Sequence, residues 1–92
     1  MLIEFDPAKN ERNIAERGLS FERAADFDFS SAIVGIDDRK TYPERRYVAV
    51  GFLDQRLHVL CFTPIESGIR VISFRKANRR EVKAYEQAQN TD

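Results

Sequence analysis

Four short apolar runs, rich in β-branched residues, fill the middle of the chain and constrain its fold most strongly. Polar segments separate the runs, which is typical of β-strands joined by turns. Asp54-Gln55-Arg56, between the second and third runs, has a length suited to a β-hairpin. The near-continuous apolar character of these two runs predicts that both faces of their sheet are covered. The expected strands are residues 32–36, 46–53, 57–63 and 69–75, with a shorter strand at residues 2–5 and a loop at residues 64–68.

Helix signals lie on both sides of these runs. Asp6-Pro7 is typical of an N-cap followed by Pro at the first helical position, and this helix is expected to end near residue 17 at Gly18. Ser20 is a second expected N-cap, of a helix that reaches about residue 28.

A capping box predicts the last helix. Asn78 is followed three residues later by Glu81, and the helix is expected to run to about residue 89. The predicted order is β-α-α-β-β-β-β-α. This order indicates a small α+β fold with helices packed on an antiparallel sheet, formed by one domain over residues 1–92.

The composition excludes several classes of protein. One Cys cannot form a disulfide within the chain, and one Cys with one His is too few for a structural zinc site. No motif for a metal or cofactor is present, so none is expected. No apolar run has the length of a membrane span and the start does not resemble a signal peptide. We therefore expect a cytoplasmic protein.

The charge is strongly polarised although the net charge is zero. Residues 1–38 carry −5, residues 39–69 carry +2, residues 70–83 carry +5 and the last nine residues carry −2. Such asymmetry indicates an anionic partner better than the total does. A solvated helix face with internal ion pairs is the alternative explanation. The basic residues of the +5 segment are Arg70, Arg75, Lys76, Arg79, Arg80 and Lys83.

The spacing of these cations predicts which of them share a face of the strand or of the helix. In a regular strand, Ser73 and Arg75 would lie on one face, with Arg70, Ile72 and Phe74 on the other. Arg79 and Lys83 are four residues apart, so they share a helix face, with Arg80 beside it. Guanidinium groups bind phosphate through two hydrogen bonds, so this grouping suits a nucleic-acid backbone.

The two residues most often used in catalysis have simple structural explanations here. His58 lies inside an apolar run and is expected to be a partly buried strand residue. Because it is the only His, a two-histidine acid–base mechanism is excluded. Cys61 is expected to be a small buried apolar residue, since no base is adjacent to it in sequence.

Three stretches in register resemble the BrnT family of bacterial toxins, over about residues 2–86. The first stretch carries the opening signature, the second a central hairpin strand and the third the closing signature. They are Phe5-Asp6-Pro7-Ala8-Lys9 with Asn13, Arg17-Gly18-Leu19-Ser20-Phe21-Glu22 and Ala24; Glu44 to Asp54; and Ile69 to Glu81 with Tyr85.

The resemblance implies a RelE-like fold and the toxin of a type II toxin–antitoxin pair. Such a toxin is a metal-independent ribonuclease that arrests translation. The implied partners are an RNA substrate and a BrnA-like antitoxin with a ribbon-helix-helix domain, in a 2:2 assembly. Operator DNA would be contacted through the antitoxin.

The closing signature also implies the site. Arg75, Arg79 and Arg80 become the candidate catalytic residues, and Arg70, Lys76 and Lys83 the candidate RNA-binding residues. Fixed cations stabilise the charge that accumulates on phosphoryl oxygens when a 2′-hydroxyl attacks phosphorus. Proton transfer also needs an acid and a base, for which Glu81, Tyr85, His58 and the Lys and Arg side chains are open candidates, although Arg is a poor base at its usual pKa.

One departure from the family pattern suggests a second hypothesis. Many members have Thr-Glu-Arg after the second hairpin strand, where this chain has Thr63-Pro64-Ile65-Glu66. The family's first-helix His and early Trp are replaced by Arg17 and Phe5. The alternative is a weak or inactive homologue that acts as a binding module and co-repressor with its antitoxin. A plain structural domain with a solvated basic face is the third hypothesis.

Overall fold

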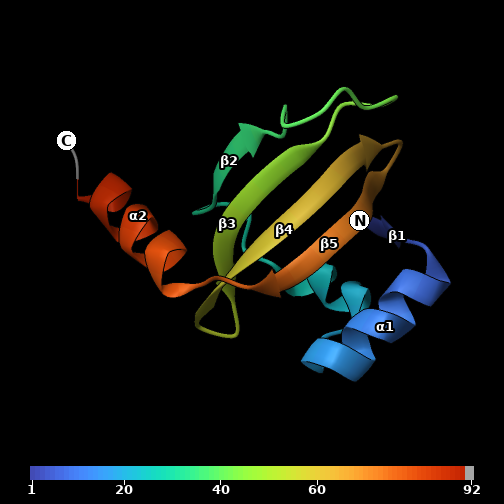
Figure 1. Cartoon of the computed structure of the whole chain (residues 1–92), viewed down its shortest axis with the longest axis horizontal. Coiled ribbons are helices and arrows are strands. Elements are labelled where there is room, and N and C mark those ends of the chain that lie inside the picture. Colours follow the sequence, from blue (N-terminus) through green and yellow to red (C-terminus); the bar gives the residue numbers. More distant parts are fainter. Residues whose placement is uncertain (91–92) are drawn as a thin grey trace.

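The computed structural model describes residues 1–90, which form one five-stranded sheet with helices at both ends of the chain (Figure 1). The strand order across the sheet is β1-β5-β4-β3-β2. The elements are β1 (Leu2–Glu4), α1 (Pro7–Arg17), the 3-10 helix η1 (Phe21–Asp26), β2 (Ile33–Ile36), β3 (Tyr47–Leu53), β4 (Arg56–Ile65), β5 (Gly68–Lys76) and α2 (Arg79–Gln89).

The sheet is mixed, so the prediction of an antiparallel sheet is wrong at one edge. Strands β2 to β5 pair antiparallel, but β1 pairs parallel with β5. The whole chain from α1 to β4 forms the crossover between these two parallel strands. The pair is close: a Cβ on Gly68 would lie 1.9 Å from the carbonyl oxygen of Leu2, so only glycine fits there.

The predicted caps are present, but the second helix is of a different type. Asp6 caps α1 by accepting from the amide of Ala8, and Gly18 ends it with a φ of 64°. Ser20 caps the next segment as predicted, yet η1 is a 3-10 helix that ends at Asp26. Burial of Phe21 and Ala24 against the sheet fixes this short piece, and 3-10 geometry is common in such connectors.

The hairpin and the loop after it are both tighter than predicted. Two residues, Asp54 and Gln55, join β3 to β4, with φ values of 51° and 68°. Positive φ at both central residues is typical of the type I′ turn, whose twist matches that of the flanking strands. Strand β4 also continues through Pro64, which pairs with Ile69. The predicted loop at residues 64–68 therefore shrinks to residues 66–67.

Apolar side chains cover both faces of the sheet centre, as the sequence predicted for the two hairpin strands, although Val48 and Val50 of β3 are only partly buried. One face, called here the η1 face, packs against η1 and its flanking residues. The other, the α2 face, packs partly against α2. The buried residues on the η1 face are Leu19, Phe21, Ala24, Phe27, Ala49, Leu53, Leu60, Phe62, Ile69, Val71 and Phe74, and those on the α2 face are Leu57, Val59, Ala77 and Tyr85.

A β-bulge in β5 changes which cations share a face. Cys61 pairs with Ser73 but the next β4 residue, Phe62, pairs with Val71, so Ile72 is left without a partner in the ladder. The extra residue reverses the alternation of side chains before it. Arg70 therefore lies on the same face as Ser73 and Arg75, and the prediction of opposite faces is wrong.

Candidate functional site

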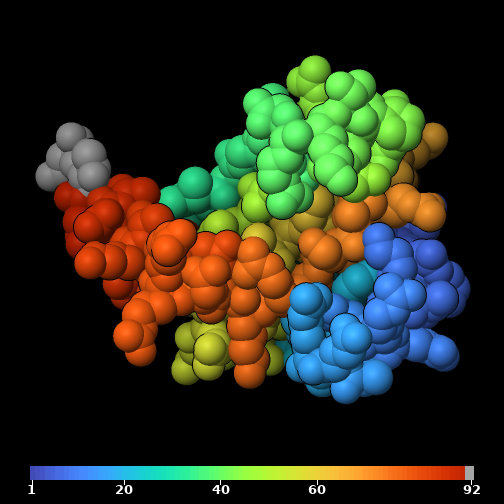
Figure 2. Space-filling view, viewed as in Figure 1, coloured from blue at the N-terminus to red at the C-terminus, as the bar shows by residue number. Residues whose placement is uncertain are grey.

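A polar cleft of about 320 Å³ opens on the α2 face, between α2 and the segment that follows β2. Figure 2 shows the green segment around residue 40 and the red helix α2 standing on either side of a hollow. The cleft floor consists of strand residues, and its walls carry charged side chains of both signs. The lining residues are Ile36, Asp37, Asp38, Arg39, Val48, Val59, Cys61, Ser73, Arg75 and Glu81.

Arg75 lies in this cleft, but its charge is already matched. Its two terminal nitrogens donate to the two carboxylate oxygens of Glu81 at 2.8 and 2.9 Å. Glu81 Oε1 also accepts from the amide of Asn78, which completes the predicted capping box. The hydrogen bond from Arg75 lowers the pKa of Glu81 to about 2. Glu81 is therefore ionised and engaged at neutral pH.

A second ion pair forms the opposite wall. The side chain of Asp37 is 1% exposed and accepts two hydrogen bonds of 2.8 Å from Arg39, whose side chain is 75% exposed. These bonds lower the pKa of Asp37 to about 2. The Cys61 thiol faces the same carboxylate at 3.8 Å, and burial raises its pKa. Cys61 is thus buried, as the sequence predicted.

Arg79 and Arg80 are the free cations at this end of the molecule. Both lie in the first turn of α2, directly after the strand that carries Arg75. Both are exposed, and neither forms a hydrogen bond or ion pair with another residue of the part that the structure describes. Lys83, one turn further along α2, is exposed in the same way. These three cations are available to an anionic partner.

The other two predicted RNA-binding residues lie elsewhere. Arg70 forms an ion pair with Glu4 at the β1 edge of the sheet, where both side chains are almost half exposed. Lys76 pairs with His58 across the sheet, on the η1 face. The structure therefore brings Arg75, Arg79 and Arg80 to one end of β5, with Lys76 at the same end but on the opposite face of the sheet. Arg70 lies towards the other end of the strand.

Lys76 belongs to a second pocket, of about 280 Å³, at the hairpin end of the η1 face. Two of its cations, Arg17 and Arg56, are not among the site residues that the sequence predicts. The signal for Arg56 was its place at the hairpin turn, two residues before His58. The lining residues are Arg17, Gly18, Leu19, Arg23, Leu53, Asp54, Arg56, His58 and Lys76.

Glu81, Tyr85 and His58 differ in their hydrogen-bond partners and in their burial. Glu81 is paired with Arg75, and the Tyr85 hydroxyl donates to the carbonyl oxygen of Ser31 at 2.7 Å. His58 is 5% exposed, and its Nδ1 lies 2.8 Å from the carbonyl oxygen of Arg56. Burial lowers the pKa of His58. Its other ring nitrogen, Nε2, has no hydrogen-bond partner within residues 1–90.

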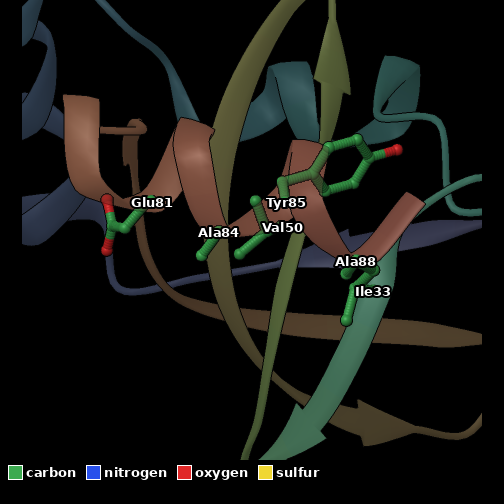
Figure 3. A pocket seen from close by; sticks show the side chains of 6 residues that line it. All are labelled: Ile33, Val50, Glu81, Ala84, Tyr85 and Ala88. Atoms are coloured by element: carbon green, nitrogen blue, oxygen red, sulfur yellow. The ribbon is translucent and has the colours of Figure 1, made fainter. Parts of the chain in front are cut away.

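An apolar groove lies between α2 and the edge of the sheet. In Figure 3, Ala84, Tyr85 and Ala88 of α2 lie beside Val50 of β3 and Ile33 of β2, and these residues with Glu81 line the groove. β2 itself is an edge strand, and one side of its backbone has no strand partner among residues 1–90. All four of its residues are exposed. Exposed apolar edges of this kind are rare unless another chain covers them.

The fold and these surfaces define a small α+β protein with free cations, and with an apolar edge suited to a second chain. Comparison with known families makes the class specific. A family described as "Ribonuclease toxin, BrnT, of type II toxin-antitoxin system" matches residues 5–81, and the chain belongs to that family. The chain is therefore a member of a family of ribonuclease toxins from type II toxin–antitoxin systems, which implies a cognate antitoxin as its partner.

No curated protein matches the chain. Among residues 1–90, no helix combines the length and the apolar character needed to cross a membrane.

Proposed function

We propose that this chain is a metal-independent endoribonuclease of the bacterial cytoplasm, with a RelE-like fold and one toxin domain over residues 1–92. It arrests translation by cutting RNA. The observation that carries this proposal is the position of Arg79 and Arg80, exposed and unpaired within residues 1–90, beside the cleft that holds Arg75.

The chemistry of metal-free RNA cleavage fits these cations. The 2′-hydroxyl attacks phosphorus, the bond to the 5′ oxygen breaks, and negative charge accumulates on the phosphoryl oxygens. Arg79 and Arg80 bind that phosphate, and Arg75 joins them when the phosphate displaces Glu81. Arg70, Lys76 and Lys83 contact neighbouring parts of the RNA. A cation held by a carboxylate before substrate arrives is oriented without side-chain freedom to lose on binding.

Expression of the chain alone in a bacterium tests the proposal. Growth should stop and transcripts should be cut, and the double variant Arg79→Ala/Arg80→Ala should restore growth at equal protein level. Lys9→Ala/Arg12→Ala on α1 is the matched control and should stay toxic. Growth arrest by the Arg79/Arg80 variant would refute the assigned site, and normal growth with folded wild-type protein would refute the activity.

A second candidate function is a co-repressor without ribonuclease activity. Two observations favour it: Thr63-Pro64-Ile65-Glu66 stands where many family members have Thr-Glu-Arg, so that motif's Arg is absent, and Arg75 is neutralised by Glu81. Under this hypothesis the chain leaves growth unchanged but alters the affinity of its antitoxin for operator DNA. A gel-shift titration of antitoxin and operator with added toxin separates the two functions.

The antitoxin is the partner for the apolar edge. Three of the seven exposed large apolar side chains of residues 1–90, Ile33, Val34 and Ile36, lie within β2. The groove beside α2 continues that surface. Interface cores are depleted of charge, so this is where the protein partner required by the family binds. We propose a ribbon-helix-helix, BrnA-like antitoxin in a 2:2 complex that contacts operator DNA through the antitoxin.

A further inference from the structure

The pocket at the hairpin end carries more uncompensated positive charge than the cleft that holds Arg75. The cleft lining has three carboxylates, Asp37, Asp38 and Glu81, against two guanidinium groups. The hairpin-end pocket has one carboxylate, Asp54, and that group is bound by Arg23 with two contacts of 2.9 Å. The three remaining cations are Arg17, Arg56 and Lys76.

One of these cations is held in place by a buried amide. Asn13 is 5% exposed, and its Nδ2 donates to the carbonyl oxygens of Leu19 and Phe74, both at 2.9 Å. Its remaining oxygen accepts from Arg17 Nη1 at 2.6 Å. Asn13 thus ties the end of α1 to β5 and orients a guanidinium at the pocket without neutralising it.

His58 presents a hydrogen-bond acceptor among these cations. A carbonyl oxygen can only accept, so the contact of 2.8 Å with Arg56 places the ring hydrogen on Nδ1. In the neutral ring, Nε2 then carries a lone pair. Thr63 Oγ1 is the one fully buried side-chain nitrogen or oxygen of residues 1–90 without a partner, so the unpartnered Nε2 is not fully buried, and the ring lines the pocket.

We propose that the hairpin-end pocket binds one ribonucleotide unit of RNA, its phosphate between Arg17, Arg56 and Lys76 and its 2′-hydroxyl donating to His58 Nε2. The pocket is a second RNA subsite on the η1 face, separate from the cleft that holds Arg75. Cations alone bind DNA and RNA alike, whereas an acceptor beside them selects the strand that carries a 2′-hydroxyl. This subsite rests on the proposed ribonuclease function.

The test uses ligands too small to be cleaved. Uridine 3′-phosphate, its 2′-deoxy counterpart and inorganic phosphate are titrated into the wild-type protein, with NMR detection of the His58 ring. The ribonucleotide should shift the His58 ring signals and bind about tenfold more tightly than the deoxynucleotide, which corresponds to one lost hydrogen bond to a buried acceptor. Unmoved His58 signals, or equal affinity for any two of these ligands, would overturn the proposal.

Two variants separate the role of each group. Lys76→Ala should weaken binding of both nucleotides about tenfold, and Lys9→Ala on α1 is the matched control. His58→Asn keeps an amide N–H for the Arg56 carbonyl but removes Nε2, so it should lower only the preference for ribose. Unchanged preference in folded His58→Asn would overturn the proposal. Because His58 is buried, the wild-type ligand comparison decides the question if this variant does not fold.

Failure of the subsite and failure of the proposed function give different results. If the wild-type protein cuts RNA but the ribonucleotide does not shift the His58 ring signals, the proposed subsite is wrong and the proposed ribonuclease activity is supported. If the ring responds as expected but the protein cuts no RNA, the subsite stands as a binding site and the ribonuclease proposal fails.

Discussion

Arg75 and Glu81 connect the last strand to the first turn of α2 through two parallel hydrogen bonds of 2.8 and 2.9 Å. Glu81 also closes the capping box with Asn78, so one carboxylate fixes both the start of the helix and its angle to the sheet. The same pair lines the cleft that we assign to RNA. Stability and the resting state of the cleft are therefore linked through a single side chain.

Replacement of this carboxylate should destabilise the fold. We expect Glu81→Gln to lower the free energy of unfolding by about 1–3 kcal/mol, because it weakens a charge-assisted pair and a helix cap together. Urea denaturation measures this loss. Glu86→Gln, at an exposed position on the same helix, is the control and should change stability by less than about 0.5 kcal/mol. Equal stability of the two variants would show that the pair contributes nothing.

The two lowered carboxylate pKa values predict loss of stability in acid. Asp37 and Glu81 have pKa values of about 2 in the folded protein, below the ordinary values of 3.8 and 4.5. Their contribution is fully present above pH 4.5 and is lost as the pH falls towards 2, because the unfolded chain binds protons first. Urea midpoints measured from pH 6 to 2 check this, and in Glu81→Gln the decline should be shallower.

The exposed arginines predict a change in salt dependence. Binding of single-stranded RNA should weaken as salt rises, and each phosphate contact contributes about 0.7 to the slope of log affinity against log salt. We expect Arg79→Ala/Arg80→Ala to reduce that slope by about 1.4 without changing the unfolding midpoint. Fluorescence anisotropy at several salt concentrations measures it. Lys9→Ala/Arg12→Ala should keep the wild-type slope. A similar reduction in that control would show that Arg79 and Arg80 contribute no more to RNA binding than other surface cations do.

The apolar edge predicts where antitoxin binding is sensitive. Ile33→Asp places a charge on both the groove and the edge strand, so the affinity for the antitoxin should fall at least tenfold, the cost of burying an unpaired polar group. Calorimetry with purified antitoxin measures the affinity. Ile14→Asp, on an exposed apolar position of α1, is the control. If both variants bind as the wild type does, the antitoxin lies elsewhere.

The close pairing of β1 with β5 predicts a glycine requirement. In Gly68→Ala the new Cβ meets the backbone of Leu2, so β1 must move and the free energy of unfolding should fall by about 1–3 kcal/mol. Gly35→Ala is the matched control, because nothing lies within 4 Å of its Cβ position. Thermal unfolding of both variants checks this. A wild-type midpoint for Gly68→Ala would mean that β1 adds little to the sheet.

Local signals predicted most of the fold. The caps at Asp6, Gly18 and Asn78 act within a few residues, so the sequence alone located the helix ends. What the sequence could not supply depends on contacts between distant segments. The parallel partner of β1 and the bulge at Ile72 are set by pairing across the sheet, which periodicity along one strand does not contain.

The candidate site was predictable in composition but not in arrangement. Charge counting located the basic segment that holds Arg75 and Lys76, yet consecutive strand residues point to opposite faces, so they line different pockets. The pairing of Arg75 with Glu81 was also hidden, because the sequence indicates Glu81 as a capping residue and an acid–base candidate but not as an ion-pair partner. Arg17 reaches its pocket through Asn13, a buried contact to Phe74 that lies 61 residues away in sequence.

The parallel pairing of β1 with β5 also determines when the sheet can close during synthesis of the chain. The first strand made, β1, has its partner in β5, which is the last strand made and lies between β1 and β4. A nascent chain cannot close its sheet until residues 68–76 have left the ribosome, and the helix with Arg79 and Arg80 follows later still. Pairing of such distant segments is slow to form. A growing chain therefore holds neither a closed sheet nor the arginines of the proposed site until residues 68–80 have emerged.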